Sequence, residues 1–173
     1  PPNSYAVATV GTEGSDLKDV EVYSHYAIAV NQDGPVQVID LQYLPDSAKT
    51  VARFNNANVS GAHTIHISGN YAYLSLNGAG TRDLRILDIS NPLAPVEVGH
   101  YTHPQQGQLF ADAHDAYAYG NTLYVANLDG GVSILDISDK ANPVLLKVHN
   151  YAGNFTHNVW TTIDGKYLLT TDE

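Results

Sequence analysis

The segment GAHTIHISGNYAYLS, at residues 61–75, decides the fold of this chain. It contains two alternating runs of apolar residues on either side of a Gly-Asn pair, a pattern that predicts two antiparallel strands joined by a tight turn. Versions of it recur as DAHDAYAYGNTLYVA at residues 112–126 and as FTHNVW at residues 155–160. Each copy contains a histidine near its start. The chain is therefore built from repeats.

The strand that follows each hairpin gives the clearest register between the repeats. These strands read VQVIDL at residues 36–41, LRILDIS at 84–90 and VSILDIS at 132–138, with an aspartate at the same place in each. Several short strands in a repeat of about 40–50 residues are the signature of propeller blades. We therefore predict an all-β fold, a β-propeller with four-stranded antiparallel blades.

The repeats divide a single propeller segment, residues 1–173, into blade units. The expected units are residues 16–57, 60–102 and 112–151, a partial unit at 155–173, and the last strand of a preceding blade at 1–10. About three full blades and parts of two others make a partial ring, because propellers have about 4–8 blades. We expect the remainder of the propeller, another chain or another copy to pair with the open edges.

Composition narrows the classes of partner. The chain of 173 residues has a formal net charge of -10, which disfavours nucleic acid and anionic membrane surfaces as ligands. No apolar run is long enough for direct membrane insertion. The absence of cysteine excludes disulfides and thiolate chemistry, and it is compatible with an extracellular location.

The third strands and the proline-containing turns after them, at residues 84–92 and 132–143, resemble the LVIVD repeat family of bacterial and archaeal surface proteins. Within that family the chain is similar to the choice-of-anchor B group, most specifically at FTHNVW (155–160) and DGKY (164–167). The resemblance implies a β-propeller that is extracellular, at the cell surface or periplasmic, and it carries no established activity. Lys18 departs from the pattern, since it stands where the first repeat would have its histidine.

The repeated histidines are the best candidates for a site. The first strand of each blade lines the channel of a propeller, so His63, His114 and His157 are expected at equivalent heights near the channel mouth. Imidazole is the commonest protein ligand for zinc and copper, and this predicts a divalent metal site. Asp112 would support it, because strand alternation places residues 112 and 114 on one face. Alternatively, each histidine hydrogen-bonds the backbone of a neighbouring blade and fixes blade packing.

Other polar residues offer weaker candidates. Loops at the same end of the channel would form a polar binding rim; its residues are Asn77, Asp83, Asp129 and His103. The loop at 127–131 has oxygen ligands for calcium, although a plain turn explains it better. The aspartates before the turns, Asp40, Asp88 and Asp136, are expected to accept hydrogen bonds from backbone N–H groups.

Two functions compete on this evidence. The repeat architecture, the acidic charge and the absence of a Gly-x-Ser-x-Gly or phosphate-binding motif favour a non-enzymatic extracellular binding or scaffold module, with a protein or a carbohydrate as its ligand. The alternative is a metal-dependent enzyme, redox or hydrolytic, whose channel histidines hold the ion.

Overall fold

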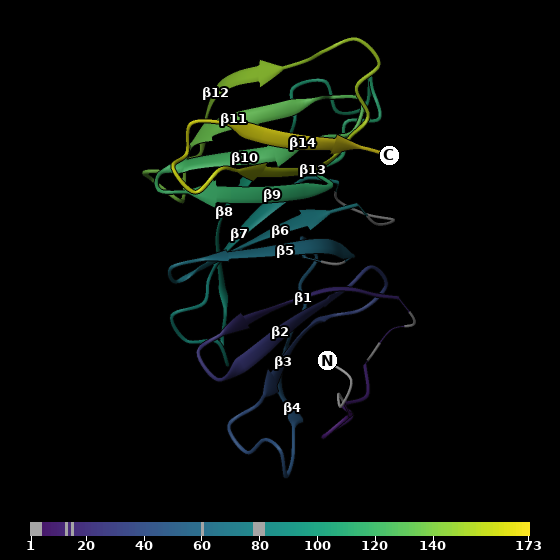
Figure 1. Cartoon of the computed structure of the whole chain (residues 1–173), viewed down its shortest axis with the longest axis vertical. Coiled ribbons are helices and arrows are strands. Elements are labelled where there is room, and N and C mark those ends of the chain that lie inside the picture. Colours follow the sequence, from purple (N-terminus) through teal and green to yellow (C-terminus); the bar gives the residue numbers. More distant parts are fainter. Residues whose placement is uncertain (1–4, 13, 15, 60, 78–81) are drawn as a thin grey trace.

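The computed structural model describes residues 5–12, 14, 16–59, 61–77 and 82–173. These residues form strands, turns and loops without a helix, so none of the described segments contains a helix long and apolar enough to cross a membrane. Their strands assemble into three four-stranded antiparallel sheets and one two-stranded sheet (Figure 1). The predicted all-β class with four-stranded antiparallel blades is confirmed.

Each sheet is one blade, and its strands pair in the order of the chain. The first blade comprises β1 (Leu17–Tyr23), β2 (Tyr26–Asn31), β3 (Val36–Asp40) and β4 (Lys49–Phe54). The second comprises β5 (Ala62–Ser68), β6 (Tyr71–Leu76), β7 (Leu84–Asp88) and β8 (Val96–Tyr101). The third comprises β9 (Asp115–Tyr119), β10 (Thr122–Ala126), β11 (Val132–Asp136) and β12 (Val144–His149), and the partial fourth comprises β13 (Thr156–Thr161) and β14 (Leu168–Asp172).

The innermost strands hold the blades together. β1 contacts β5, β5 contacts β9, and β9 contacts β13, so the four sheets follow one another in an open arc (Figure 1). β1, β5 and β9 each turn tightly into the second strand of the blade, whereas residues 162–167 join β13 to β14. Gly69 and Gly120 take positive φ values of 59° and 60° in two of these turns, a conformation that glycine adopts at little cost.

The third strands end as the repeated aspartates predict. The Oδ1 atoms of Asp40, Asp88 and Asp136 each accept a hydrogen bond of 2.8 Å from the backbone N–H two residues further on. Hydrogen bonds from Ser90 and Ser138 lower the pKa of Asp88 and of Asp136. The prediction that these aspartates occupy equivalent places and stabilise turns is confirmed.

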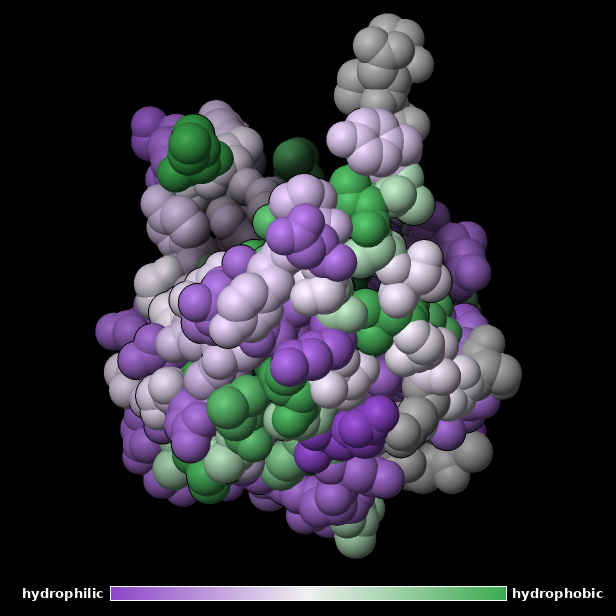
Figure 2. Space-filling view, turned by 90° about the horizontal axis from the view of Figure 1, so that it is seen from below, coloured by the Kyte–Doolittle hydropathy of each residue, from purple (hydrophilic) through white to green (hydrophobic). Residues whose placement is uncertain are grey.

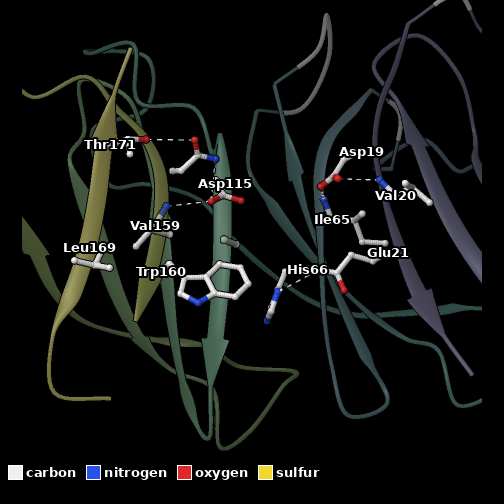
Figure 3. Close-up of a pocket in the computed structure, with 12 residues that line it drawn as sticks. Asp19, Val20, Glu21, Ile65, His66, Asp115, Val159, Trp160, Leu169 and Thr171 are labelled. Carbon is white, nitrogen blue, oxygen red and sulfur yellow. Dashed lines mark hydrogen bonds and ion pairs between the residues drawn. The ribbon is translucent and has the colours of Figure 1, made fainter. Parts of the chain in front are cut away.

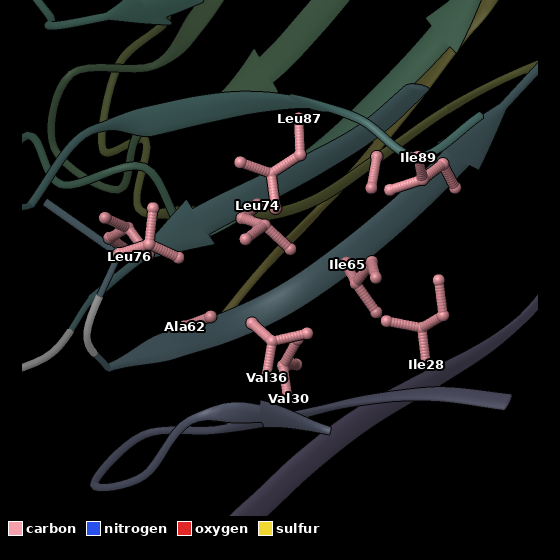
Figure 4. Close-up of a cluster of buried hydrophobic side chains, with 11 residues drawn as sticks. Ile28, Val30, Val36, Ala62, Ile65, Leu74, Leu76, Leu87 and Ile89 are labelled. Carbon is pink, nitrogen blue, oxygen red and sulfur yellow. The ribbon is translucent and has the colours of Figure 1, made fainter. Parts of the chain in front are cut away.

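The cores lie between successive blades. Figure 4 shows one of them, where Ile28 and Val30 of the first blade face Ile65, Leu74 and other apolar side chains of the second. A second core joins the second and third blades, and a smaller one joins the third blade to β13. The blades are thus stabilised by packing against their neighbours, as in other repeat folds.

The expected strand at residues 1–10 is not formed in the part that the structure describes. Residues 5–12 contain no strand, and residues 1–4 lie outside the described residues, as do 60 and 78–81 of the later units. A strand forms only where a neighbouring strand pairs with it, and residues 5–12 belong to none of the four sheets. The prediction of a strand there was wrong for the described part of the segment.

Candidate functional site

The three predicted histidines occupy the same place at the start of the innermost strands. The pairing of β5 with β6 skips His63, between Ala62 and Thr64, and the pairing of β13 with β14 skips His157 in the same way. His114 immediately precedes β9, and its backbone N–H donates to the carbonyl of Ala126. An extra residue in a strand redirects its side chain. The bulges therefore aim the imidazoles of His63 and His157 out of the ordinary alternation of their strands, and His114 holds the equivalent place just before β9.

The three imidazole rings lie next to one another, and the planes of successive rings are tilted by 57° and 44°. The ring centroids of His63 and His114 are 4.3 Å apart, and those of His114 and His157 are 4.1 Å apart. The first blade has the same irregularity at Lys18, whose Nζ lies 3.0 Å from Asp16 Oδ2. Lys18 therefore lies at the position equivalent to the three histidines, and the first blade has a cation there in place of an imidazole.

Hydrogen bonds set the tautomers of two of the rings. His114 Nδ1 lies 3.1 Å from the carbonyl oxygen of His157, which can only accept, so Nδ1 carries the proton. His157 Nδ1 lies 2.6 Å from Oδ1 of Asn158, whose amide is oriented by a bond from its Nδ2 to Asp115. In the neutral rings both Nε2 atoms keep a free lone pair. His114 thus fixes blade packing through one nitrogen and can ligate through the other.

Glu173 joins two of the histidines as a candidate metal ligand. His114, His157 and Glu173 each offer one ligand atom, and these atoms all lie within 4.8 Å of one another. Nε2 of His157 is 3.7 Å from Oε2 of Glu173. Imidazole nitrogen and carboxylate oxygen are ordinary zinc ligands, so the donor set suits such an ion. His63 lies beside this group, with its Nδ1 buried and without a hydrogen-bond partner.

The surroundings favour neutral imidazoles. Burial lowers the pKa of His114 to about 4, and the charges of His63 and His157 act in the same direction. The pKa of His63 is also lowered, first by burial and then by Lys18 and His157. A neutral ring is the form that binds a metal, so these histidines need not lose a proton at neutral pH to act as ligands.

Asp112 does not take the supporting role expected for it. Its Oδ2 lies 3.5 Å from Nη1 of Arg82, and no ion pair to His114 is formed among the described residues. β9 begins only at Asp115, so strand alternation does not reach Asp112. Asp112 is 2% exposed, and burial raises the pKa of its carboxyl group.

Two of the four residues predicted to form a polar rim are buried. Asp83 is 5% exposed and accepts hydrogen bonds of 3.0 and 2.8 Å from Nε and Nη2 of Arg85, inside the second blade. His103 is 3% exposed, and burial lowers its pKa. Asp129 is exposed, and Asn77 is half-buried with its carbonyl oxygen bonded to Gln32. Asp83 was mispredicted because the sequence does not show that Arg85 is buried and needs its charge balanced.

Carboxylates on the innermost strands link one blade to the next. Asp115 Oδ2 accepts the backbone N–H of Val159 at 3.0 Å, and Asp19 Oδ2 accepts that of Ile65 at 3.1 Å. These N–H groups lie on the inner edge of each blade, where no further strand pairs with them. The side chain of Asp115 therefore points to the next blade.

A second group of side chains, which the sequence did not single out, lines the inner surface of the arc (Figure 3). Glu21, His66, Tyr117 and Trp160 stand three residues after Lys18 and the three histidines, respectively. Nδ1 of His66 is 3.5 Å from Oε1 of Glu21, and the rings of Tyr117 and Trp160 are 4.1 Å apart. The constant offset from the bulge was the signal that could have identified this group.

Two segments of the chain match the LVIVD repeat, residues 61–103 and 111–151. They correspond to the second and third blades. The chain matches no curated protein.

Solved structures share the fold at low sequence identity. The designed protein Ika4 has a TM-score of 0.68 and 11% identity, with 98% of each chain covered. The periplasmic gluconolactonase of Pseudomonas aeruginosa has a TM-score of 0.69 and 16% identity, with 93% of this chain and 51% of that chain covered. The β-propeller domain of Cps50 from Myceliophteria thermophila has a TM-score of 0.65 and 13% identity, covering 91% and 49%.

The chain is therefore a β-propeller segment, and it spans about half the length of these two natural propellers. Its second and third blades match the LVIVD repeat, in agreement with the sequence resemblance. Likeness at such low identity defines the fold and leaves the activity open.

Proposed function

We propose that the chain is part of a β-propeller binding module that acts outside the cell and holds a divalent transition-metal ion at one end of its channel. One observation carries the proposal, the convergence of ligand atoms from His114, His157 and Glu173 within 4.8 Å. Two of the three ligands are imidazoles, which zinc and copper accept readily and calcium does not. Zinc or copper is therefore the ion that fits, in preference to calcium.

The arrangement needs only a small adjustment to close around an ion. A tetrahedral zinc site with bonds of about 2.0–2.2 Å has its ligand atoms roughly 3.4 Å apart. The side chain of Glu173 is 63% exposed and is not confined by packing, so it can move toward the two rings. The rings themselves are held by the bonds from their Nδ1 atoms, as is usual for a histidine that binds a metal through its other nitrogen.

The experiment is a metal analysis of protein purified without chelator, followed by equilibrium dialysis against Zn²⁺ and Cu²⁺. We expect one ion per chain, and we expect His114→Ala and His157→Ala each to weaken its binding by at least tenfold. His100→Ala, which removes an exposed histidine on β8, is the matched control and should change nothing. Binding that survives both cluster substitutions would overturn the proposal.

A metal-dependent enzyme is the second candidate, because two histidines and one carboxylate are the ligands of a common hydrolytic zinc site with an open fourth position. Because the similar propeller from Pseudomonas aeruginosa is named a gluconolactonase, lactone hydrolysis is the activity to assay. Glucono-δ-lactone is the substrate to test, with the zinc-loaded chain and with His114→Ala. Hydrolysis that requires both zinc and His114 would favour the enzyme, and its absence would leave the binding module.

The proposal includes an extracellular, cell-surface or periplasmic location and membership of the choice-of-anchor B group. The sequence resemblance supports both. Detection of the native protein in the cell-surface or periplasmic fraction of its source, and not in the cytoplasmic fraction, is the test. A purely cytoplasmic protein would contradict this part of the proposal.

A further inference from the structure

The inner surface of the arc contains a cavity, and His63, His114 and His157 do not line it. It has a volume of about 420 Å³ and lies between β1, β5, β9 and β13, with β14 at one side (Figure 3). Small-molecule sites usually measure about 300–1,000 Å³. The cavity is therefore large enough for a small ligand of its own.

An aromatic platform stands at this cavity. Trp160 is 54% exposed, and its ring packs against Tyr117 at 4.1 Å and approaches His66 at 6.0 Å. Figure 3 shows Trp160 and His66 on facing strands with their rings directed toward the space between them. An exposed indole that is supported from one side offers its other face to a flat apolar surface of a ligand.

The charged side chains that line the cavity disfavour an anionic ligand. The lining includes the carboxylates of Asp19, Glu21 and Asp115, and it contains neither lysine nor arginine. A phosphate or carboxylate ligand would meet only like charge there. Nε2 of His66 is buried and has no hydrogen-bond partner among the described residues, so a ligand hydroxyl can bond to it once the ring turns toward the cavity.

Two of the carboxylates are already engaged, which argues against an organic cation. Asp19 and Asp115 accept backbone N–H groups of the next blade, and Glu21 faces His66. The cavity thus offers hydrogen-bonding oxygens and nitrogens beside an aromatic face, without a free anionic centre.

We propose that this cavity binds a neutral sugar, whose pyranose ring stacks on Trp160 while its hydroxyl groups bond to His66 and to the carboxylates. Aromatic stacking supplies the apolar contact with the C–H face of the ring, and the polar groups orient it. Asn158 lies between the two sites, because it lines the cavity and its Oδ1 contacts Nδ1 of His157. The proposal requires no metal in the histidine cluster.

The chain contains a single tryptophan, so intrinsic fluorescence reports on this cavity alone. The probes are the methyl glycosides of glucose, galactose and mannose, with glucuronate as the anionic counterpart and glucosamine as the cationic one. We expect at least one neutral glycoside to shift the Trp160 emission saturably, and glucuronate to bind at least tenfold more weakly. No saturable shift with any neutral glycoside would overturn the proposal, as would binding of glucosamine alone.

Variants separate the site from general effects on the fold. Saturation-transfer NMR with the best glycoside should lose its signal in Trp160→Ala and weaken in His66→Gln. Tyr167→Ala removes an aromatic ring that is 69% exposed outside the cavity, and it should bind like the parent chain. His114→Ala should also keep sugar binding, because the side chain of His114 does not line the cavity. Equal loss in Tyr167→Ala or His114→Ala would contradict the assigned location.

Discussion

Val20 and Ile65 occupy the same position in the first and second blades, yet their surroundings differ completely. Ile65 is 3% exposed, as is its counterpart Ala116 in the third blade, and Val159 in the fourth is 1% exposed. Val20 is 52% exposed. The buried side chains face the blade before their own, as Ile65 faces Ile28. A blade therefore buries this face only when another blade precedes it.

The comparison extends to the whole outer face of β1. Leu17, Val20 and Val22 are 48%, 52% and 64% exposed. Figure 2, which views the molecule from the end that holds the first blade, shows apolar side chains at the surface among hydrophilic ones. We propose that a further blade covers this face, supplied by the remainder of the propeller, by another chain or by another copy.

The largest expected effect is a direct test of this difference. Ile65→Ala should lower the free energy of unfolding by about 3 kcal/mol, because it leaves a cavity in a packed core. Val20→Ala should cost less than about 0.5 kcal/mol in the same chain, because its side chain is already exposed. Urea denaturation measures both. Equal losses would mean that the two positions are not in different surroundings, and the comparison would fail.

The second effect concerns pH. The pKa of His114 is about 4 in the folded protein, below the ordinary value of 6.5 in an unfolded chain. The unfolded state therefore binds more protons between these values, and the free energy of unfolding should fall by on the order of 2 kcal/mol as the pH drops from about 6.5 to about 4. Denaturation of metal-free protein at several pH values measures this slope.

His114→Gln should flatten that slope, and the exposed His100→Gln should not. His63, whose pKa is lowered in the same direction, should leave a smaller residual dependence. An unchanged slope in His114→Gln would show that the buried imidazole is not its source. The first blade gives a natural contrast here, because Lys18 takes the place of the histidine.

The smallest effect tests the carboxylates that link the blades. Asp115→Ala leaves the N–H of Val159 unpaired at a buried place and should cost about 1–2 kcal/mol. Asp19→Ala removes the equivalent bond to Ile65 beside the open face and should cost less, about 0.5–1 kcal/mol. Thermal unfolding of the two variants gives the order, and a larger loss for Asp19→Ala would contradict it.

Much of the fold was predictable because the repeated motifs show which residues occupy equivalent positions in successive blades. The strands from β2 onward fall close to the alternating runs, and Asp40, Asp88 and Asp136 serve as the turn acceptors that their spacing indicates. The strand expected at residues 1–10 failed for the opposite reason. Its apolar pattern suits a strand, but a pattern does not supply the neighbour with which a strand must pair.

The site was predictable only where position in the repeat decides the outcome. The close approach of the rings of His63, His114 and His157 follows from their equivalent places in the repeats. Glu173 was missed as a ligand because its approach depends on how β14 ends beside β13. Asp112 was assigned by strand alternation that does not apply before β9 begins.

The most direct test of the account is a crystal structure of the chain grown with Zn²⁺, with anomalous scattering recorded at the zinc edge. The account predicts one peak between His114, His157 and Glu173, about 2.0–2.1 Å from Nε2 of each histidine. The contact between the rings of His63 and His114 and the packing of the blades should be unchanged. No peak at this place, or peaks only at exposed histidines such as His100, would contradict the claim that the repeated bulges build a metal site.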